Sequence, residues 1–175
     1  MSKLEVDKVT PQSGTTLTIG DNGDTTNIVG TLQNNGSAVE VDSVTFKEGG
    51  TNFTNSLLVG TSSTGTLSSA DGNTGVGTGV LAALTSGDSN VAVGLSSLAA
   101  NTTGIQNTAL GFKTLCANTT ASGNIAVGAF SLQTNTEGLS NVAIGTCQPS
   151  GYGAALELNT TGDCNVAVGN GALRS

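Results

Sequence analysis

A pentapeptide of the form Asn-x-Ala-x-Gly, in which Gly replaces Ala once, returns at regular intervals along the chain. Its six copies begin at Asn73, Asn90, Asn107, Asn124, Asn141 and Asn165. The first four steps are 17 residues long and the last is 24 residues long. Helical-hairpin repeats need about 33 residues or more, whereas so short a period suits one coil of a β-solenoid with two strands and two turns. The spacing therefore predicts a stack of coils, each covered by its neighbours.

Other positions keep the same register. A Leu stands eight residues after five of the six Asn residues, and the exception is the coil that begins at Asn141. Allowing for the seven extra residues of that coil puts Leu156 in this position. We therefore expect an insertion near 148–154, where Pro, Ser and Gly indicate a loop. The repeat positions expected to define the coils are Asn90, Ala92, Gly94, Leu98, Asn107, Ala109, Gly111, Leu115, Asn124, Ala126, Gly128, Leu132, Asn141, Ala143, Gly145, Asn165, Ala167 and Gly169.

The two faces of each short strand differ in side-chain size. Val91 and Val93 share one face, while Ala92 points to the other, because side chains alternate along a strand. A solvent-facing position would tolerate Lys or Glu, so we expect the Ala face to contact another chain and the Val face to fill the coil. The alternative, that Ala fits a narrow coil interior, stays open. Asn and Gly at the strand ends favour corners, and stacked Asn side chains predict a hydrogen-bonded ladder.

The N-terminal part differs from the repeats but is also predicted to be all-β. LEVDKVT (4–10) and VEVDSVT (39–45) alternate between apolar and polar residues, as half-buried strands do. Strand-like segments also occur at 15–20, 26–32 and 55–60. The domains expected are an N-terminal β-rich segment over 1–60, a junction rich in Ser, Thr and Gly over 61–72, and a repeat shaft over 73–175.

The composition excludes several classes of protein. Lys and Arg number only five against 12 Asp and Glu, for a net charge of −7, so the chain lacks a basic surface for nucleic acid. No apolar run approaches the roughly 20 residues of a membrane-spanning helix. Cys116, Cys147 and Cys164 have no CxxC spacing and no His beside them, because the chain contains no His. We interpret them as small buried apolar residues made in a reducing compartment.

The sequence predicts no catalytic, cofactor or metal site. Without His, Ser-His and Cys-His arrangements are excluded. Asp71, Asp88 and Asp163 each precede a repeat Asn by two residues, but other coils carry apolar or hydroxyl residues there, so we interpret these carboxylates as turn residues. Asp21 and Asp24 are interpreted as a surface turn in preference to a Ca²⁺ site. Tyr152, in the insertion, is the candidate for a surface contact.

The recurring SNVAIG (140–145), with Gly closing each strand, resembles the head repeat of trimeric autotransporter adhesins of the YadA type. The longer pattern NTALG…L…NTTG…NIAVG is similar to repeats of phage tail-fibre proteins, and MSKLEVDKVTPQSGTTLTIGD resembles the start of tail-fibre proteins from phages of aquatic bacteria. The resemblance implies a left-handed parallel β-roll, assembled as an intertwined homotrimer. The period is longer than is usual in the adhesin heads, and no signal peptide, stalk or membrane anchor is visible, which favours a virion protein made in the host cytoplasm.

The expected function is therefore that of a structural virion protein, not an enzyme. An elongated, all-β chain would attach to the phage tail or baseplate through its N-terminal segment, form a trimeric shaft, and reach a host receptor through a distal part. Because the sequence stops partway through a coil, we expect the protein to continue beyond Ser175. The alternatives are a trimeric surface adhesin head that binds the host directly and a glycan-degrading tailspike, which would use paired carboxylates.

Overall fold

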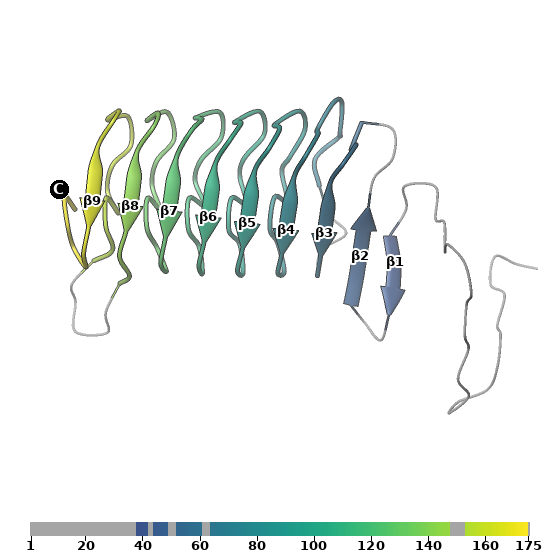
Figure 1. Ribbon diagram of the computed structural model, residues 1–175, viewed down its shortest axis with the longest axis horizontal. Helices are drawn as coiled ribbons and strands as arrows, with labels where there is room; N and C mark the ends of the chain where they lie inside the picture. The colour runs from purple at the N-terminus through teal and green to yellow at the C-terminus, as the bar shows by residue number, and fades with distance from the viewer. Residues whose placement is uncertain (1–37, 42–43, 49–51, 61–63, 148–152, 175) are drawn as a thin grey trace, which may run out of the picture. The chain divides into compact units, whose positions relative to one another are not determined.

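A computed structural model describes the backbone of residues 38–41, 44–48, 52–60, 64–147 and 153–174, and the side chains from residue 52 onward. All of these residues belong to one compact unit, Asn34–Ser175. They form one nine-stranded sheet and contain no helix (Figure 1). The strands are β1 (Ala38–Val41), β2 (Val44–Glu48), β3 (Leu57–Val59), β4 (Thr74–Val76), β5 (Val91–Val93), β6 (Thr108–Leu110), β7 (Ile125–Val127), β8 (Val142–Ile144) and β9 (Val166–Val168).

The strands from β3 to β9 pair in parallel and in sequence order. Thr74 pairs with Val91, and each later partner lies 17 residues further on until the last step, from Val142 to Val166. Seen in Figure 1, successive coils repeat side by side with one short strand each. The prediction of a parallel β-solenoid with 17-residue coils is therefore confirmed, but the prediction of two strands in each coil is wrong, because each described coil has one.

The N-terminal strands of the described region form an antiparallel hairpin in place of the single strand expected over 39–45. Val41 pairs with Val44, so the chain reverses within that segment. β2 then pairs antiparallel with β3, where the parallel ladder begins. The strands expected at 4–10, 15–20 and 26–32 lie outside the described residues.

The parallel ladder begins before the first repeat motif. Leu57–Val59 pairs with β4 in the register of the later coils, and the Ser56 hydroxyl accepts a hydrogen bond from the backbone N–H of Asn73 at 2.8 Å. Within the expected junction 61–72, Ser68 N donates to Thr85 O at 2.9 Å, so its described part already lies in a coil. The Asn-x-Ala-x-Gly motif is not recognisable in this coil, because Ser56 stands at the Asn position and Leu58 at the Ala position.

The insertion lies where the shifted Leu position predicted it. Cys147 N still donates to Ala129 O in the ordinary register, at 3.2 Å. Leu132 N donates to Ala155 O at 3.1 Å, which aligns Leu156 with the Leu position of the preceding coil. The additional residues are therefore accommodated between Cys147 and Ala155, without displacing β9 from the ladder.

The coil interior is filled by the face that we expected to contact another chain. Ala92, Ala109, Ala126 and Ala143 are 0% exposed, whereas Val91 and Ile125 face outward and are 36% and 42% exposed. The prediction that Val fills the coil is wrong, and the alternative of a narrow interior is correct. A Cβ added to Gly75 would stand 2.5 Å from Leu58 Cδ2 of the preceding coil, which shows how little space the interior leaves.

The Leu position completes the core from a corner of the coils of β4 to β8. The φ angle lies between 48° and 51° at Leu81, Leu98, Leu115, Leu132 and Leu156, and all five side chains are buried. The left-handed conformation costs roughly 1–2 kcal/mol for a residue with a Cβ. Burying a Leu side chain contributes about 1.5–3 kcal/mol, which offsets that cost. A Gly here would adopt the corner more easily but would leave the interior unfilled.

Candidate functional site

The repeated Asn residues form a continuous column inside the coils. The Oδ1 of Asn73 accepts hydrogen bonds from both the backbone N–H and the Nδ2 of Asn90, at 3.0 and 3.1 Å. The same Nδ2 donates to Gly104 O at 2.9 Å. The pattern continues coil by coil to Asn165. These positions, predicted as a ladder, hold neighbouring coils together.

A second Asn column runs along another corner. Asn118 Nδ2 donates to Asn101 Oδ1 at 2.9 Å and to Ala121 O at 3.0 Å, and Asn135 and Asn159 continue the series. Every buried side-chain nitrogen and oxygen in the described part of the chain has a hydrogen-bond partner. The interior of the described coils therefore uses its polar groups for its own structure, and a ligand would have to bind outside.

The Gly residues that follow the strands allow adjacent coils to approach closely. Gly94 has φ of 118°, and a Cβ there would stand 2.5 Å from Gly111 O in the next coil. Real Cβ atoms do not approach a backbone oxygen so closely, so a side chain at this position requires the backbone to move. The predicted corner role of this repeat Gly is confirmed by both angle and distance.

The carboxylates considered for catalysis act as acceptors in turns. Asp88 Oδ1 accepts the backbone N–H of Asp71 at 2.8 Å, and Asp163 Oδ1 accepts that of Leu139 at 2.6 Å. This agrees with their interpretation as turn residues. Across the described residues, no group of three or more His, Cys, Asp or Glu side chains is placed to hold a metal ion. Asp21, Asp24 and Tyr152 lie outside the described residues.

The cysteines are less uniform than the sequence indicated. Cys116 and Cys147 are half-buried, but Cys164 is exposed, so the prediction of a buried residue is wrong there. Cys164 directly precedes the repeat Asn, at a corner with φ of 56°, and its side chain points away from the interior. Burial raises the pKa of the Cys116 thiol.

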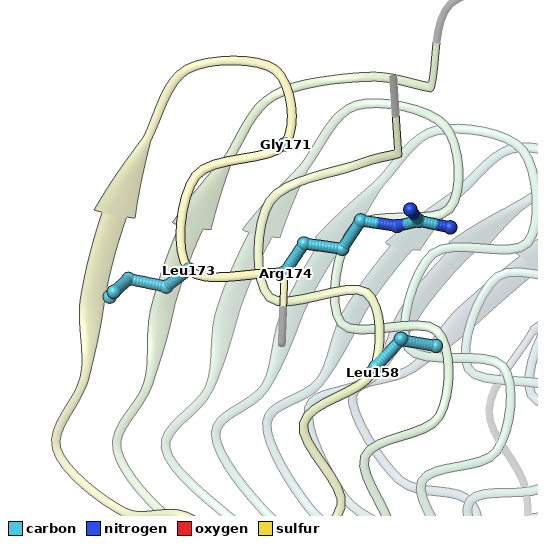
Figure 2. Close-up of a pocket in the computed structure, with 4 residues that line it drawn as sticks. All are labelled: Leu158, Gly171, Leu173 and Arg174. Carbon is cyan, nitrogen blue, oxygen red and sulfur yellow. The ribbon is translucent and has the colours of Figure 1, made fainter. Parts of the chain in front are cut away.

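A shallow pocket lies at the last described coil. Leu158, Gly171, Leu173 and Arg174 line it, and its volume is about 460 Å³ (Figure 2). Arg174 Nε lies 3.1 Å from Glu157 Oε2, which also accepts the backbone N–H of Ala154 at 3.1 Å. This ion pair joins the end of the described chain to the segment that follows the insertion. Arg174 is the one ionisable residue of the four, and none of them carries a carboxylate, hydroxyl or thiol group.

The most prominent surface feature is apolar and lies on the outside of the sheet. We use the term outward face for the first and third residues of β3–β9 together with the residues two positions after and three positions before each strand. Of the 15 large apolar side chains exposed in the described region, 13 belong to this face. They are Leu57, Val76, Val91, Val93, Leu95, Ile105, Leu110, Phe112, Ile125, Leu139, Ile144, Val166 and Val168.

An aromatic pair lies at one border of the outward face. The rings of Phe112 and Phe130 meet edge to face, with centroids 5.1 Å apart and an interplanar angle of 87°. The Lys113 ammonium lies 5.5 Å from the centroid of the Phe112 ring. The sequence offers Phe112, Phe130 and Tyr152 as the aromatic residues of the repeats, and Tyr152 is preferred as the candidate contact because it lies in the insertion. The spacing of 18 residues between Phe112 and Phe130, one more than the period, could have indicated neighbouring coils.

Among the described residues there is no helix that could cross a membrane. Comparison of the chain with protein-family models, with curated proteins and with solved structures gave no match.

Proposed function

We propose that the chain is a structural virion protein that forms the shaft of a homotrimeric phage tail fibre. Its N-terminal segment would attach to the tail or baseplate, and its coils would project a receptor-binding part towards the host. The observation that carries this proposal is the outward face, which has 13 exposed large apolar residues, nine of them on the strands of one in-register parallel ladder and four beside those strands. Soluble monomers rarely expose a continuous apolar patch larger than a few hundred Å².

The size of the outward face fits association between chains. With on the order of 70 Å² exposed per large apolar residue, the face offers about 900 Å², close to the roughly 800 Å² that each partner buries in a stable complex. Three copies that turn these faces towards a common axis would remove all of them from water. The proposal of three copies also draws on the resemblance of SNVAIG to the trimeric adhesin heads.

The described coils suit a mechanical role. Each coil is joined to the next by strand hydrogen bonds, by two Asn columns and by a close-packed row of Ala and Leu. The residues that line the pocket of Figure 2 are Leu158, Gly171, Leu173 and Arg174, and none of them carries a carboxylate. A glycan-degrading tailspike would need a carboxylate that is available for catalysis. The Asp side chains of the described coils instead accept backbone hydrogen bonds in turns. The adhesin alternative would use Tyr152 and the insertion.

Two measurements test the proposal. Sedimentation velocity of the purified chain should give the mass of three copies, and a stable monomer would exclude the trimer. Gold-labelled antibodies against residues 64–147, applied to phage particles that carry the chain, should mark the tail in electron micrographs. Labelling of a bacterial surface in the absence of phage would favour the adhesin, and cleavage of host glycans by the purified chain would favour the tailspike.

A further inference from the structure

Asn170 differs from the Asn residues of the two columns. In the first column, Asn90 Oδ1 accepts two hydrogen bonds from Asn107, and its Nδ2 donates to two acceptors at 3.1 and 2.9 Å. Asn170 is instead exposed and is followed by Gly171, and no other Asn among the described residues is followed by Gly. Because Gly has no Cβ, the backbone nitrogen next to Asn170 is not hindered by a side chain.

The backbone N–H of Gly171 has no hydrogen-bond partner in the described part of the chain. In three regular coils, the equivalent N–H group donates to a carbonyl of the preceding coil at 2.9 to 3.0 Å. These bonds join Ser96 to Thr78, Lys113 to Leu95 and Phe130 to Phe112. The equivalent acceptor for Gly171 is the carbonyl of Thr146, which lies just before the insertion interrupts the regular spacing. The nitrogen of Gly171 is therefore available for another reaction.

The side chain of Asn170 is held through its oxygen atom alone. The backbone N–H of Thr146 donates to Asn170 Oδ1 at 3.0 Å. A donor at this oxygen draws electron density away from Cγ and stabilises the negative charge that develops when a nucleophile adds to that carbon. No hydrogen bond holds Nδ2 of Asn170 among the described residues. Its Cγ is thus activated for attack, and its amine is free to leave.

The turn that contains Asn170 can open without disturbing the rest of the ladder. Ala172 N donates to Gly169 O at 3.2 Å and closes the turn, in which Gly171 has φ of 69°. Bringing Asn170 Cγ to the nitrogen of Gly171 requires rotation of the backbone between them. Exposed turns of this kind open at a low cost in free energy, whereas the buried columns open only when whole coils separate.

We propose that Asn170 is a site of self-modification, at which the nitrogen of Gly171 converts the amide to a carboxylate. This nitrogen loses its proton and attacks Asn170 Cγ, which closes a cyclic imide, and Nδ2 leaves with a proton as ammonia. Water then opens the imide at either carbonyl. The products are Asp and isoaspartate, in which the main chain runs through Cγ. Water is the only co-reactant, and nothing is oxidised or reduced.

The modification changes the last described coil. Either product adds a negative charge, and isoaspartate also lengthens the main chain by a carbon atom before Gly171. The next residue, Ala172, is partly buried against the core, and its carbonyl accepts the N–H of Leu156 at 3.0 Å. A longer turn displaces this carbonyl. We therefore expect the coil of β9 to loosen where it contacts Leu156.

Peptide mapping by mass spectrometry tests the site. The folded full chain is incubated at neutral pH and physiological temperature and then digested, and chromatography separates the amide, Asp and isoaspartate forms of each peptide. Conversion at Asn170 should be faster than at any Asn of the two columns by about tenfold or more. Mapping by peptide also separates this site from the Asn-Gly pairs at 22–23 and 35–36, which lie outside the described residues.

Gly171→Ser is the matched variant. Ser96 occupies the equivalent position of the coil of β5 with φ of 56°, so the turn should tolerate Ser. The added side chain hinders the approach of Asn170 Cγ to the nitrogen, and conversion should slow several-fold. Hydrogen exchange at the Leu156 N–H should be faster in aged than in fresh protein, and the aged Gly171→Ser chain should keep the fresh rate.

Three outcomes would contradict the inference. Conversion of Asn170 in urea but not in the folded chain would show that the turn protects the amide. Formation of Asp without isoaspartate would mean direct hydrolysis, because no imide would then have formed. An unchanged exchange rate at Leu156 after conversion would overturn the effect on the coil. None of these results depends on how many copies of the chain associate, so the proposed function is tested separately.

Discussion

Asn107 and Asn90 are joined twice through one oxygen atom. The Oδ1 of Asn90 accepts from the backbone N–H of Asn107 at 3.0 Å and from its Nδ2 at 3.1 Å. The same arrangement recurs between the neighbouring coils from Asn73 to Asn165. The Asn side chain therefore accepts the backbone hydrogen bond that a strand carbonyl would otherwise accept. Because both residues are buried, water cannot replace a lost bond, and the stability of the solenoid depends on these amides.

Asn107→Ala should therefore lower the free energy of unfolding by about 2–4 kcal/mol. The substitution removes the acceptor for the backbone N–H of Asn124, and each buried group left unpaired costs roughly 1–3 kcal/mol. Urea unfolding followed by circular dichroism at a fixed protein concentration measures the change. Asn165→Ala in the half-exposed coil of β9 is the control, and it should cost less than half as much. Equal losses would mean that burial does not set the cost.

The two faces of β7 should respond differently to charge. Ala126→Lys should abolish the β-sheet signal in circular dichroism, because the interior is closed around a methyl group. Ile125→Lys places the charge on the outward face and should keep the β-sheet signal. If the outward face is the contact between chains, this variant sediments as a monomer. A folded, associating Ala126→Lys variant would contradict the packing described here.

Leu58 and Gly75 should behave as a compensating pair. Gly75→Ala forces a Cβ to 2.5 Å from Leu58 Cδ2, and we expect a loss of about 1–3 kcal/mol. Leu58→Ala alone leaves a cavity and should cost roughly 2–5 kcal/mol. The double variant reproduces the Ala-on-Ala stacking of Ala92 and Ala109. A double-mutant cycle by urea unfolding should show a favourable coupling of about 1 kcal/mol or more, and simple additivity would contradict this account.

The thiols should differ in reactivity. Cys164 is exposed and should react fastest with iodoacetamide, as followed by mass spectrometry of the native protein. Burial raises the pKa of Cys116, so a smaller fraction of it is thiolate at a given pH, and its alkylation should begin at higher pH. Denatured protein, in which the thiols are equally accessible, is the control. Faster alkylation of Cys116 than of Cys164 in the native protein would contradict the burial.

Several features of the fold could be predicted from spacing alone. The period from Asn73 to Asn141 indicated the coil and its parallel register, and the displaced Leu156 located the insertion. Such regularities are visible because every coil faces the same packing constraints. The coil of β3 was missed because Ser56 and Leu58 satisfy those constraints with other residues.

The candidate surface could be predicted only in part. The sequence indicated an apolar and a small-residue side for each strand but assigned them the wrong way round. The sequence names Phe112 and Phe130 among the few aromatic residues of the repeats, but only the structure brings their rings together at the border of the outward face.

The sequence by itself determined the length of a coil, the order of its neighbours and the alternation of Val142, Ala143 and Ile144. It did not determine which side of that alternation faces inward, because alternation has the same period for either choice. The tertiary structure decided this. In the coils of β4 to β8, the corner Leu residues and the Asn columns already fill most of the enclosed space, and only a methyl group or a hydrogen atom fits beside them. The larger side chains are therefore placed outside, where a second copy can cover them.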